Sequence, residues 1–134
     1  MNKIYSSSLQ EIYFDDKTKI LKNKWLNTDI ELEDIKKEII IWMDKFKEKN
    51  PKYLLTDNLI GHIVQVEAQD WITGYIVPIV LGTGISKYAI IMSDEVISEL
   101  SVEQMVDEVK ERVSDIFQQR NFNSGEKALK WLLA

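Results

Sequence analysis

The feature that most constrains the fold is an alternation of short apolar runs with helical patterns. The run KYLLTD (52–57) follows a helical pattern over residues 32–48, and the run KYAIIMS (87–93) follows a second one over residues 67–81. Short continuous apolar runs are typical of strands that are buried on both faces. Strands joined through a helix lie parallel, and such crossovers are almost always right-handed. The sequence therefore predicts an α/β domain in which helices cover parallel strands.

An antiparallel hairpin precedes the alternating part. The segments LQEIYFDD and TKILKNKW predict two strands, with Ile12 and Phe14 on one face of the first. On the second strand, Leu21 and Trp25 share a face with Asn23. A polar side chain at this place indicates either a β-bulge or a polar spot beneath the hairpin. Together with the parallel strands, the hairpin predicts a mixed sheet.

The two helical patterns differ in how much of their surface is apolar. The first has a single apolar stripe, which consists of Leu32, Ile35, Ile39, Trp42, Met43 and Phe46. Ile41 points away from that stripe and is either an ordinary exposed residue or part of a contact surface. The second pattern, EAQDWITGYIVPIVL, is polar only in its first two turns, so this helix is buried on several sides or meets a partner. Pro78 would press on the carbonyl of Gly74, which predicts a kink there.

The C-terminal part predicts further helices and one edge strand. SDEVISEL indicates a short helix, and residues 101–104 have the pattern of a capping box that opens another. IFQQRNF (116–122) predicts a final edge strand, and residues 123–126 then cap a closing helix that contains Leu129. No linker rich in Pro, Gly or Ser divides the chain, so residues 1–134 are predicted to form a single domain.

Composition excludes several classes of protein. The chain has 134 residues, of which 45% are hydrophobic, no cysteine and a net charge of −5. An acidic chain is a poor ligand for nucleic acid, and its one basic cluster, residues 17–24, is interpreted as edge protection of the hairpin. The absence of cysteine excludes disulfides and thiol catalysis and favours a cytoplasmic location. No apolar segment reaches the ~20 residues that span a bilayer, so we expect no membrane insertion.

Three segments resemble a known family: KYLLTDN after the first long helix, KYAIIMSDEVISELSVEQ in the middle and FNSGEKALKWLL at the end. With the order of elements, they make residues 10–133 similar to STAS-like domains. These domains are related to bacterial anti-sigma-factor antagonists and to the cytoplasmic ends of sulfate transporters. The resemblance implies a mixed sheet of about five strands with helices mainly on one side. It also implies binding of another protein through the loop and helix after the third strand.

Antagonists of this type are switched by phosphorylation of a Ser or Thr at the start of that helix. In this chain the corresponding segment is NLIGHIVQVEAQDW, and it contains neither residue between Asn58 and Ile72. The phosphorylation switch is therefore not expected here, and only the contact surface carries over from the resemblance.

Asp57 and His62 are the candidate acid and base, because a carboxylate can orient an imidazole for proton transfer. No nucleophile lies near them in the sequence, so we expect Asp57 to cap a turn and His62 to be a loop residue. With Glu67 and Asp70 they are also the nearby candidate metal ligands, but a closed zinc site needs more nitrogen or sulfur ligands. No catalytic, metal or cofactor site is therefore predicted.

Two other features are open to a functional interpretation. In LGTGIS the glycines follow a helix and precede a strand, which is the reverse of a phosphate-binding loop. Gly82 or Gly84 is therefore expected to form a left-handed helix cap. The four tryptophans are expected in the core, and Trp71 is the one whose position next to the suspected contact loop also allows a role in binding.

The sequence thus predicts a non-enzymatic interaction module that binds a protein partner, with a homodimer as one form of such binding. The contact surface is expected to combine residues 57–71 with the apolar helix 72–81. Its candidate residues are Asp57, Asn58, His62, Asp70, Trp71 and Tyr75. The alternative is a small-molecule or lipid carrier with a pocket near the kinked helix 67–81. An enzyme that uses Asp57 and His62 is the third class.

Overall fold

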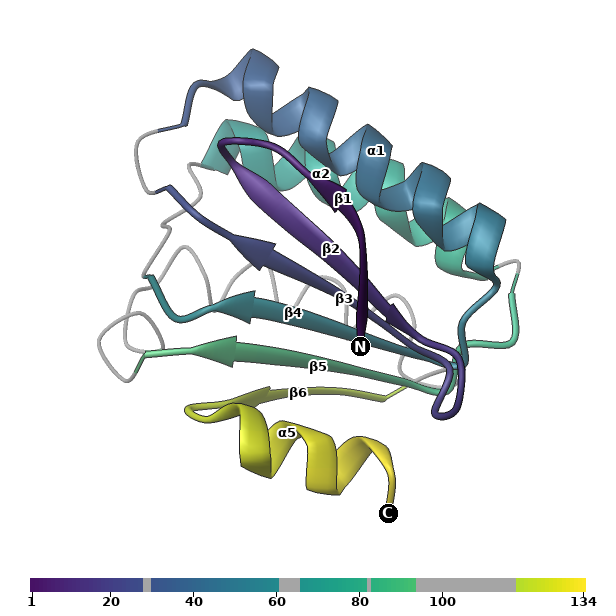
Figure 1. Ribbon diagram of the computed structural model, residues 1–134. Coiled ribbons are helices and arrows are strands. Elements are labelled where there is room, and N and C mark those ends of the chain that lie inside the picture. The colour runs from purple at the N-terminus through teal and green to yellow at the C-terminus, as the bar shows by residue number, and fades with distance from the viewer. Residues whose placement is uncertain (28–29, 61–65, 82, 94–117) are drawn as a thin grey trace.

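The computed structural model describes residues 1–27, 30–60, 66–81, 83–93 and 118–134. Within these ranges the chain forms a six-stranded sheet whose strands lie side by side in sequence order (Figure 1). The strands are β1 (Asn2–Ser6), β2 (Gln10–Asp15), β3 (Ile20–Trp25), β4 (Tyr53–Asn58), β5 (Lys87–Met92) and β6 (Gln118–Phe122). Strands β1 to β3 are antiparallel, and β3 to β6 are parallel. The predicted α/β class, the mixed sheet and the opening hairpin are confirmed.

The sheet has one strand more than the five expected, because β1 was not predicted. β1 reads NKIYS, and only Ile4 and Tyr5 are partly buried, so it lacks the apolar alternation that identifies a strand. It pairs with β2 across a register shift between Lys3 and Tyr5. β1 therefore forms a strand because it pairs with β2, and its own residue pattern does not indicate one.

Helices lie on both faces of the sheet. α1 (Leu32–Lys49) and α2 (Val66–Leu81) lie side by side on one face, and α5 (Gly125–Leu132) lies on the other (Figure 1). Two of these three helices share a face, as expected for helices that lie mainly on one side. The helix predicted from SDEVISEL and the one that residues 101–104 would open fall outside the described residues.

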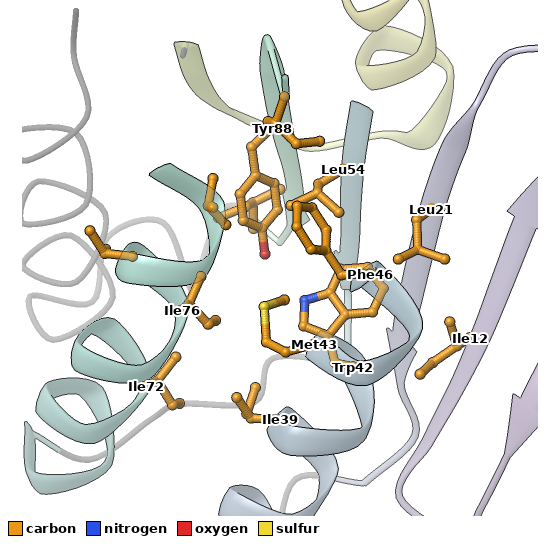
Figure 2. Packing of buried hydrophobic residues seen from close by; sticks show 14 of the residues in the cluster. Ile12, Leu21, Ile39, Trp42, Met43, Phe46, Leu54, Ile72, Ile76 and Tyr88 are labelled. Atoms are coloured by element: carbon orange, nitrogen blue, oxygen red, sulfur yellow. The ribbon is translucent and has the colours of Figure 1, made fainter. Parts of the chain in front are cut away.

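The main core lies between the sheet and the layer formed by α1 and α2. Figure 2 shows the side chains that meet there, among them Ile12, Leu21, Ile39, Trp42, Met43, Phe46, Leu54, Ile72, Ile76 and Tyr88. The predicted apolar stripe of α1 is buried in this core, except that Leu32 at its first turn is only partly buried. Burying one large apolar side chain contributes about 1.5–3 kcal/mol, so this layer fixes both helices on the sheet.

The end of α1 agrees with the prediction, but the environment of Ile41 does not. Asn50 stops the helix with a left-handed φ of 48°. Ile41 packs partly against the main core, whereas its neighbour Ile40 is 37% exposed. Glu38, three residues before Ile41 on α1, accepts from the hydroxyl of Tyr5 on β1 at Oε2, at 2.9 Å.

Asn23 marks a polar spot and not a bulge, because the pairing of β2 with β3 is continuous. Its amide donates to Oε1 of Gln10 at 3.1 Å, and the amide of Gln10 donates to the backbone oxygen of Glu38 at 2.8 Å. The Glu38 residue is only 5% exposed, and its carboxylate accepts from the hydroxyls of Ser7 at 2.5 Å and Tyr5 at 2.9 Å. These five residues, the hairpin polar cluster, tie the first three strands to α1.

A second, smaller core lies beneath α5. It consists of Ile20, Leu55, Ala89, Ile91, Ala128 and Leu132. The hydroxyl of Ser124 caps α5 by accepting from the backbone N–H of Lys127 at 3.3 Å, which confirms the predicted cap and closing helix. In the described part of the chain, β6 pairs with β5 alone and is an edge strand, as predicted. None of the described helices is long and apolar enough to cross a membrane.

Candidate contact surface on helix α2

Asp57 and Asn58, at the end of β4, occupy opposite faces of the sheet. Oδ1 of Asp57 accepts from the backbone N–H of Leu59 at 3.1 Å, and Oδ2 lies 3.9 Å from Nζ of Lys22. Asp57 therefore caps the turn after β4, as expected. Asn58 is buried at 9% exposure and points to the other face, because neighbouring residues of a strand alternate. His62 lies outside the described residues, so its expected place in the loop stays a prediction.

Exposed apolar side chains gather where the parallel strands end. Leu59 and Ile60 follow β4 and are 46% and 40% exposed, and Leu26 follows β3 and is 39% exposed. β3 and β4 pair in parallel register up to Lys24 and Asp57, so Leu26 and Leu59 leave the sheet at the same level. Binding sites of α/β proteins commonly lie at the carboxyl ends of parallel strands. We call this end of the sheet the carboxyl edge.

α2 buries most of its apolar surface within the chain itself. Its buried residues are Ala68, Ile72, Thr73, Ile76, Val77 and Val80. Asp70, Gly74, Pro78 and Leu81 are exposed, and their spacing of three or four residues places them on one side of the helix. We call this side the α2 strip. The expected excess of apolar surface is thus confined, among the described residues, to the strip and its margins.

An aromatic pair forms the margin of the strip that faces α1. The rings of Trp71 and Tyr75 are stacked, with centroids 5.1 Å apart and an interplanar angle of 7°. Nζ of Lys36, on α1, lies 5.7 Å from the centroid of the Trp71 ring. Ile40 lies one turn after Lys36 and is 37% exposed. The structure therefore brings two predicted site residues, Trp71 and Tyr75, into one partly exposed aromatic surface, with Asp70 beside it on the strip.

Gly74 and Pro78 give the strip an unusual composition for the interior of a helix. A Cβ atom added at Gly74 would have no neighbouring heavy atom within 4 Å, so packing does not require a glycine there. Pro78 has no N–H, so the carbonyl of Gly74 loses its ordinary helical donor four residues ahead. α2 nevertheless continues through Pro78 to Leu81 as one helix. The strip is therefore shallow at Gly74, and the Gly74 carbonyl lacks its ordinary helical donor.

At the end of α2, the expected left-handed glycine cap is tested only at Gly84. Gly84 does not adopt a left-handed φ, and Gly82 lies outside the described residues. Instead, the backbone N–H and the hydroxyl of Thr83 both donate to the backbone oxygen of Val80, at 3.2 and 2.9 Å. A threonine therefore satisfies a carbonyl at the end of the helix, which is the function that the sequence analysis gave to a glycine cap.

Buried hydroxyl groups line the inner side of this layer, and the sequence analysis missed them. Oγ1 of Thr56 lies 2.6 Å from the hydroxyl of Tyr88, and burial raises the pKa of Tyr88 to about 12. Oγ1 of Thr73, on α2, is buried and has no hydrogen-bond partner within the described ranges. Tyr88 lies in a run read only as an apolar strand, so alternation alone did not indicate a polar contact.

The described residues do not assemble a metal site, since no group of three or more His, Cys, Asp or Glu side chains among them could hold an ion. The exposed groups along α2 and its margins are mainly apolar, aromatic and backbone groups. No protein-family model, curated protein or solved structure matches the chain.

Proposed function

We propose that the chain is a non-enzymatic regulatory domain of STAS-like type, which binds another protein through the α2 strip. The observation that carries the proposal is the position of Gly74 and Pro78 on the exposed side of a helix that is otherwise largely buried. The order of strands and helices in the described residues is compatible with the resemblance to STAS-like domains.

Gly74 and Pro78 lower the stability of α2 without a packing gain inside the chain. Relative to alanine, glycine in a helix interior costs about 1 kcal/mol and proline about 3 kcal/mol. No atom of the described chain approaches the missing side chain of Gly74, so a buried contact does not offset this cost. A glycine does allow the backbone of a partner to come close to the helix. The composition of the strip is therefore explained by contact with a partner.

The margins of the strip supply the apolar anchors that protein interfaces use. Trp71 and Tyr75 present a stacked aromatic surface, and aromatic residues are enriched among those that carry binding energy. At the carboxyl edge, Leu59 and Ile60 add exposed apolar area close to the start of the segment that leads into α2. We therefore expect the contact to extend from the carboxyl edge along the first three turns of α2.

A pair of matched glycine substitutions tests the proposal. The purified domain is immobilised as the wild type, as Gly74→Gln and as Gly84→Gln, and proteins captured from the cytoplasm of the source cell are identified by mass spectrometry. Gly84 is the control, because it is also exposed and a Cβ there also meets nothing within 4 Å. The proposal predicts a partner that binds the wild type and Gly84→Gln but is lost with Gly74→Gln. Equal capture by all three proteins contradicts the use of the strip.

One observation favours the carrier as a second candidate function. Oγ1 of Thr73 is buried without a partner among the described residues, next to a layer in which Thr56 and Tyr88 also bury hydroxyls. A bound molecule with a polar group could satisfy such a donor. Native mass spectrometry of the purified chain decides between the two functions, because a carrier retains a stoichiometric ligand and an interaction domain gives the mass of the chain alone.

A further inference from the structure

Unpaired lysines predominate at one end of the sheet and unpaired acids at the other, although Asp15 and Asp16 lie among the lysines and Lys24 lies near the acids. At the end where the parallel strands begin, which we call the amino edge, the last turn of α1 and the neighbouring turns present lysines. The amino-edge lysines are Lys17, Lys19, Lys47, Lys49 and Lys52. Ion pairs between described residues engage other lysines, namely Lys3, Lys22, Lys36 and Lys45, so the amino-edge lysines have no carboxylate partner in the described chain.

Backbone contacts bring three of these lysines together from three different elements. The carbonyl of Lys19 accepts from the backbone N–H of Lys52 at 2.9 Å. Nζ of Lys19 and Nζ of Lys49 lie 5.8 and 5.6 Å from the centroid of the same Phe14 ring. Lys19 has a φ of 60°, a left-handed conformation that is unfavourable for a residue other than glycine. The turns before β3 and β4 are therefore joined at this edge, and Lys19 and Lys49 both reach the ring of Phe14.

The carboxyl edge is acidic. α1 begins there with Glu31 as its N-cap and Asp34 in its first turn, and Asp70 lies at the start of α2. All three are exposed, and none of them forms an ion pair within the described residues. Acids at the start of α1 and lysines at its end also stabilise the helix dipole. Lys19 and Lys52 lie outside the helices, so that effect does not account for them.

We propose that the amino edge of one copy of the chain binds the carboxyl edge of a second copy, so that copies associate head to tail through complementary charge. The proposal rests on the proposed function, because Asp70 on the α2 strip belongs to the acidic side of this contact. The net charge of −5 does not prevent it, because charges beyond about 8 Å are screened at physiological salt and the facing edges have opposite sign. A head-to-tail contact uses two different surfaces, so association continues beyond a dimer unless the copies close into a ring.

A charge-swap experiment tests this contact. The basic edge is reversed in Lys19→Glu/Lys47→Glu/Lys52→Glu, and the acidic edge in Glu31→Lys/Asp34→Lys/Asp70→Lys. Light scattering after size exclusion at about 50 mM salt should show that the wild type grows in mass with concentration, and that roughly 0.5 M salt reverses this growth. Each variant alone should associate at least about tenfold more weakly, and an equimolar mixture should recover association, because its edges are again complementary.

The matched control is Lys37→Glu/Arg120→Glu/Lys127→Glu, which changes the net charge equally at three exposed cationic residues that do not belong to the amino edge. Circular dichroism establishes that every variant is folded, and Lys47→Glu/Lys52→Glu replaces the triple variant if it is not. A wild type that stays monomeric at millimolar concentration in low salt overturns the proposal, as does a mixture that stays dissociated. If Gly74→Gln loses its partner but the charge reversals leave association unchanged, only the self-association is contradicted. If the charge reversals act as predicted but Gly74→Gln still captures its partner, the α2 strip is not the contact for other proteins.

Discussion

Replacing Gly74 by alanine should make the protein more stable and should weaken its binding to a partner. Gly74 lies in the interior of α2, is exposed, and has no heavy atom within 4 Å of the position that a Cβ would take. The added methyl group therefore neither collides nor becomes buried, and helix propensity decides the result. Alanine is favoured over glycine by about 0.8–1.0 kcal/mol in a helix interior. The free energy of unfolding should rise by that amount.

The size of the effect is within reach of ordinary unfolding measurements. An unfolding entropy of about 2.1 cal/mol/K per residue converts a gain of 1 kcal/mol into a rise in Tm of about 3–4 °C for a chain of 134 residues. Urea unfolding followed by tryptophan fluorescence should give the same gain with an unchanged m-value. The difference between Lys37→Ala and Lys37→Gly, at an exposed position of α1, calibrates the cost of glycine in this protein.

The stability of Gly74→Ala and its capture of a partner can each contradict the prediction separately. If Gly74→Ala lowers stability, the position is not open, or its backbone conformation excludes a side chain, and the description of the α2 strip is wrong. If the substitution raises stability and partner capture stays unchanged, the strip is free but is not the contact. Only a gain in stability together with weaker binding agrees with a glycine that is kept for a partner, a trade between stability and function that is common in proteins.

Further predictions concern the parts of the fold that hold the surface. Glu38→Ala removes the acceptor of the Ser7 and Tyr5 hydroxyls and should lower the free energy of unfolding by about 2–4 kcal/mol, whereas Lys37→Ala on the exposed side should change it by less than about 0.5 kcal/mol. Burial favours the neutral form of Tyr88 and raises its pKa to about 12, from about 10 unfolded, so its contribution is complete below pH 10 and is lost as the pH rises to 12. Stability should fall by about 2–3 kcal/mol over that interval through this group, and a Tyr88→Phe protein with the same slope above pH 10 would refute the assignment. Asn50→Gly should stabilise the end of α1 by about 0.5–1 kcal/mol in thermal unfolding, because glycine adopts a φ of 48° without strain, and a loss of stability would show that the asparagine side chain matters more.

The elements predicted correctly from the sequence are those whose own residues repeat with a clear period. The stripe of α1, the apolar runs of β4 and β5, and Ser124 before α5 each carry a local signal. β1 carries none, because its stability comes from pairing with β2 and from contacts with α1. Ile41 was likewise expected to point away from the apolar stripe, but it packs partly against the main core. Contacts between distant segments are what a periodic pattern cannot show.

The sequence indicated which segment carries the candidate surface, but not which side of α2 is exposed. The segment after β4 and the start of α2 were identified, and Trp71 was singled out there. The direction in which α2 faces the sheet decides that Gly74 and Pro78 are exposed while Thr73 and Val77 are buried, and an apolar helix gives no strong periodic signal of that direction. Asp57 and Asn58, in contrast, could have been placed on opposite faces by strand alternation alone.

The buried carboxylate of Glu38 lies on the flank of α1 opposite to the one that carries Lys36. Glu38 and Lys36 are two residues apart, so they project roughly 200° from each other around the helix. Glu38 fixes one flank to the hairpin through Tyr5 and Ser7, and Lys36 lies over Trp71 on the other. A buried carboxylate without a cationic partner among the described residues is a weak source of stability compared with an apolar side chain of similar size. Its hydrogen bonds do, however, join α1 to the hairpin, while the buried apolar stripe of α1 leaves Lys36 over the aromatic margin of the α2 strip.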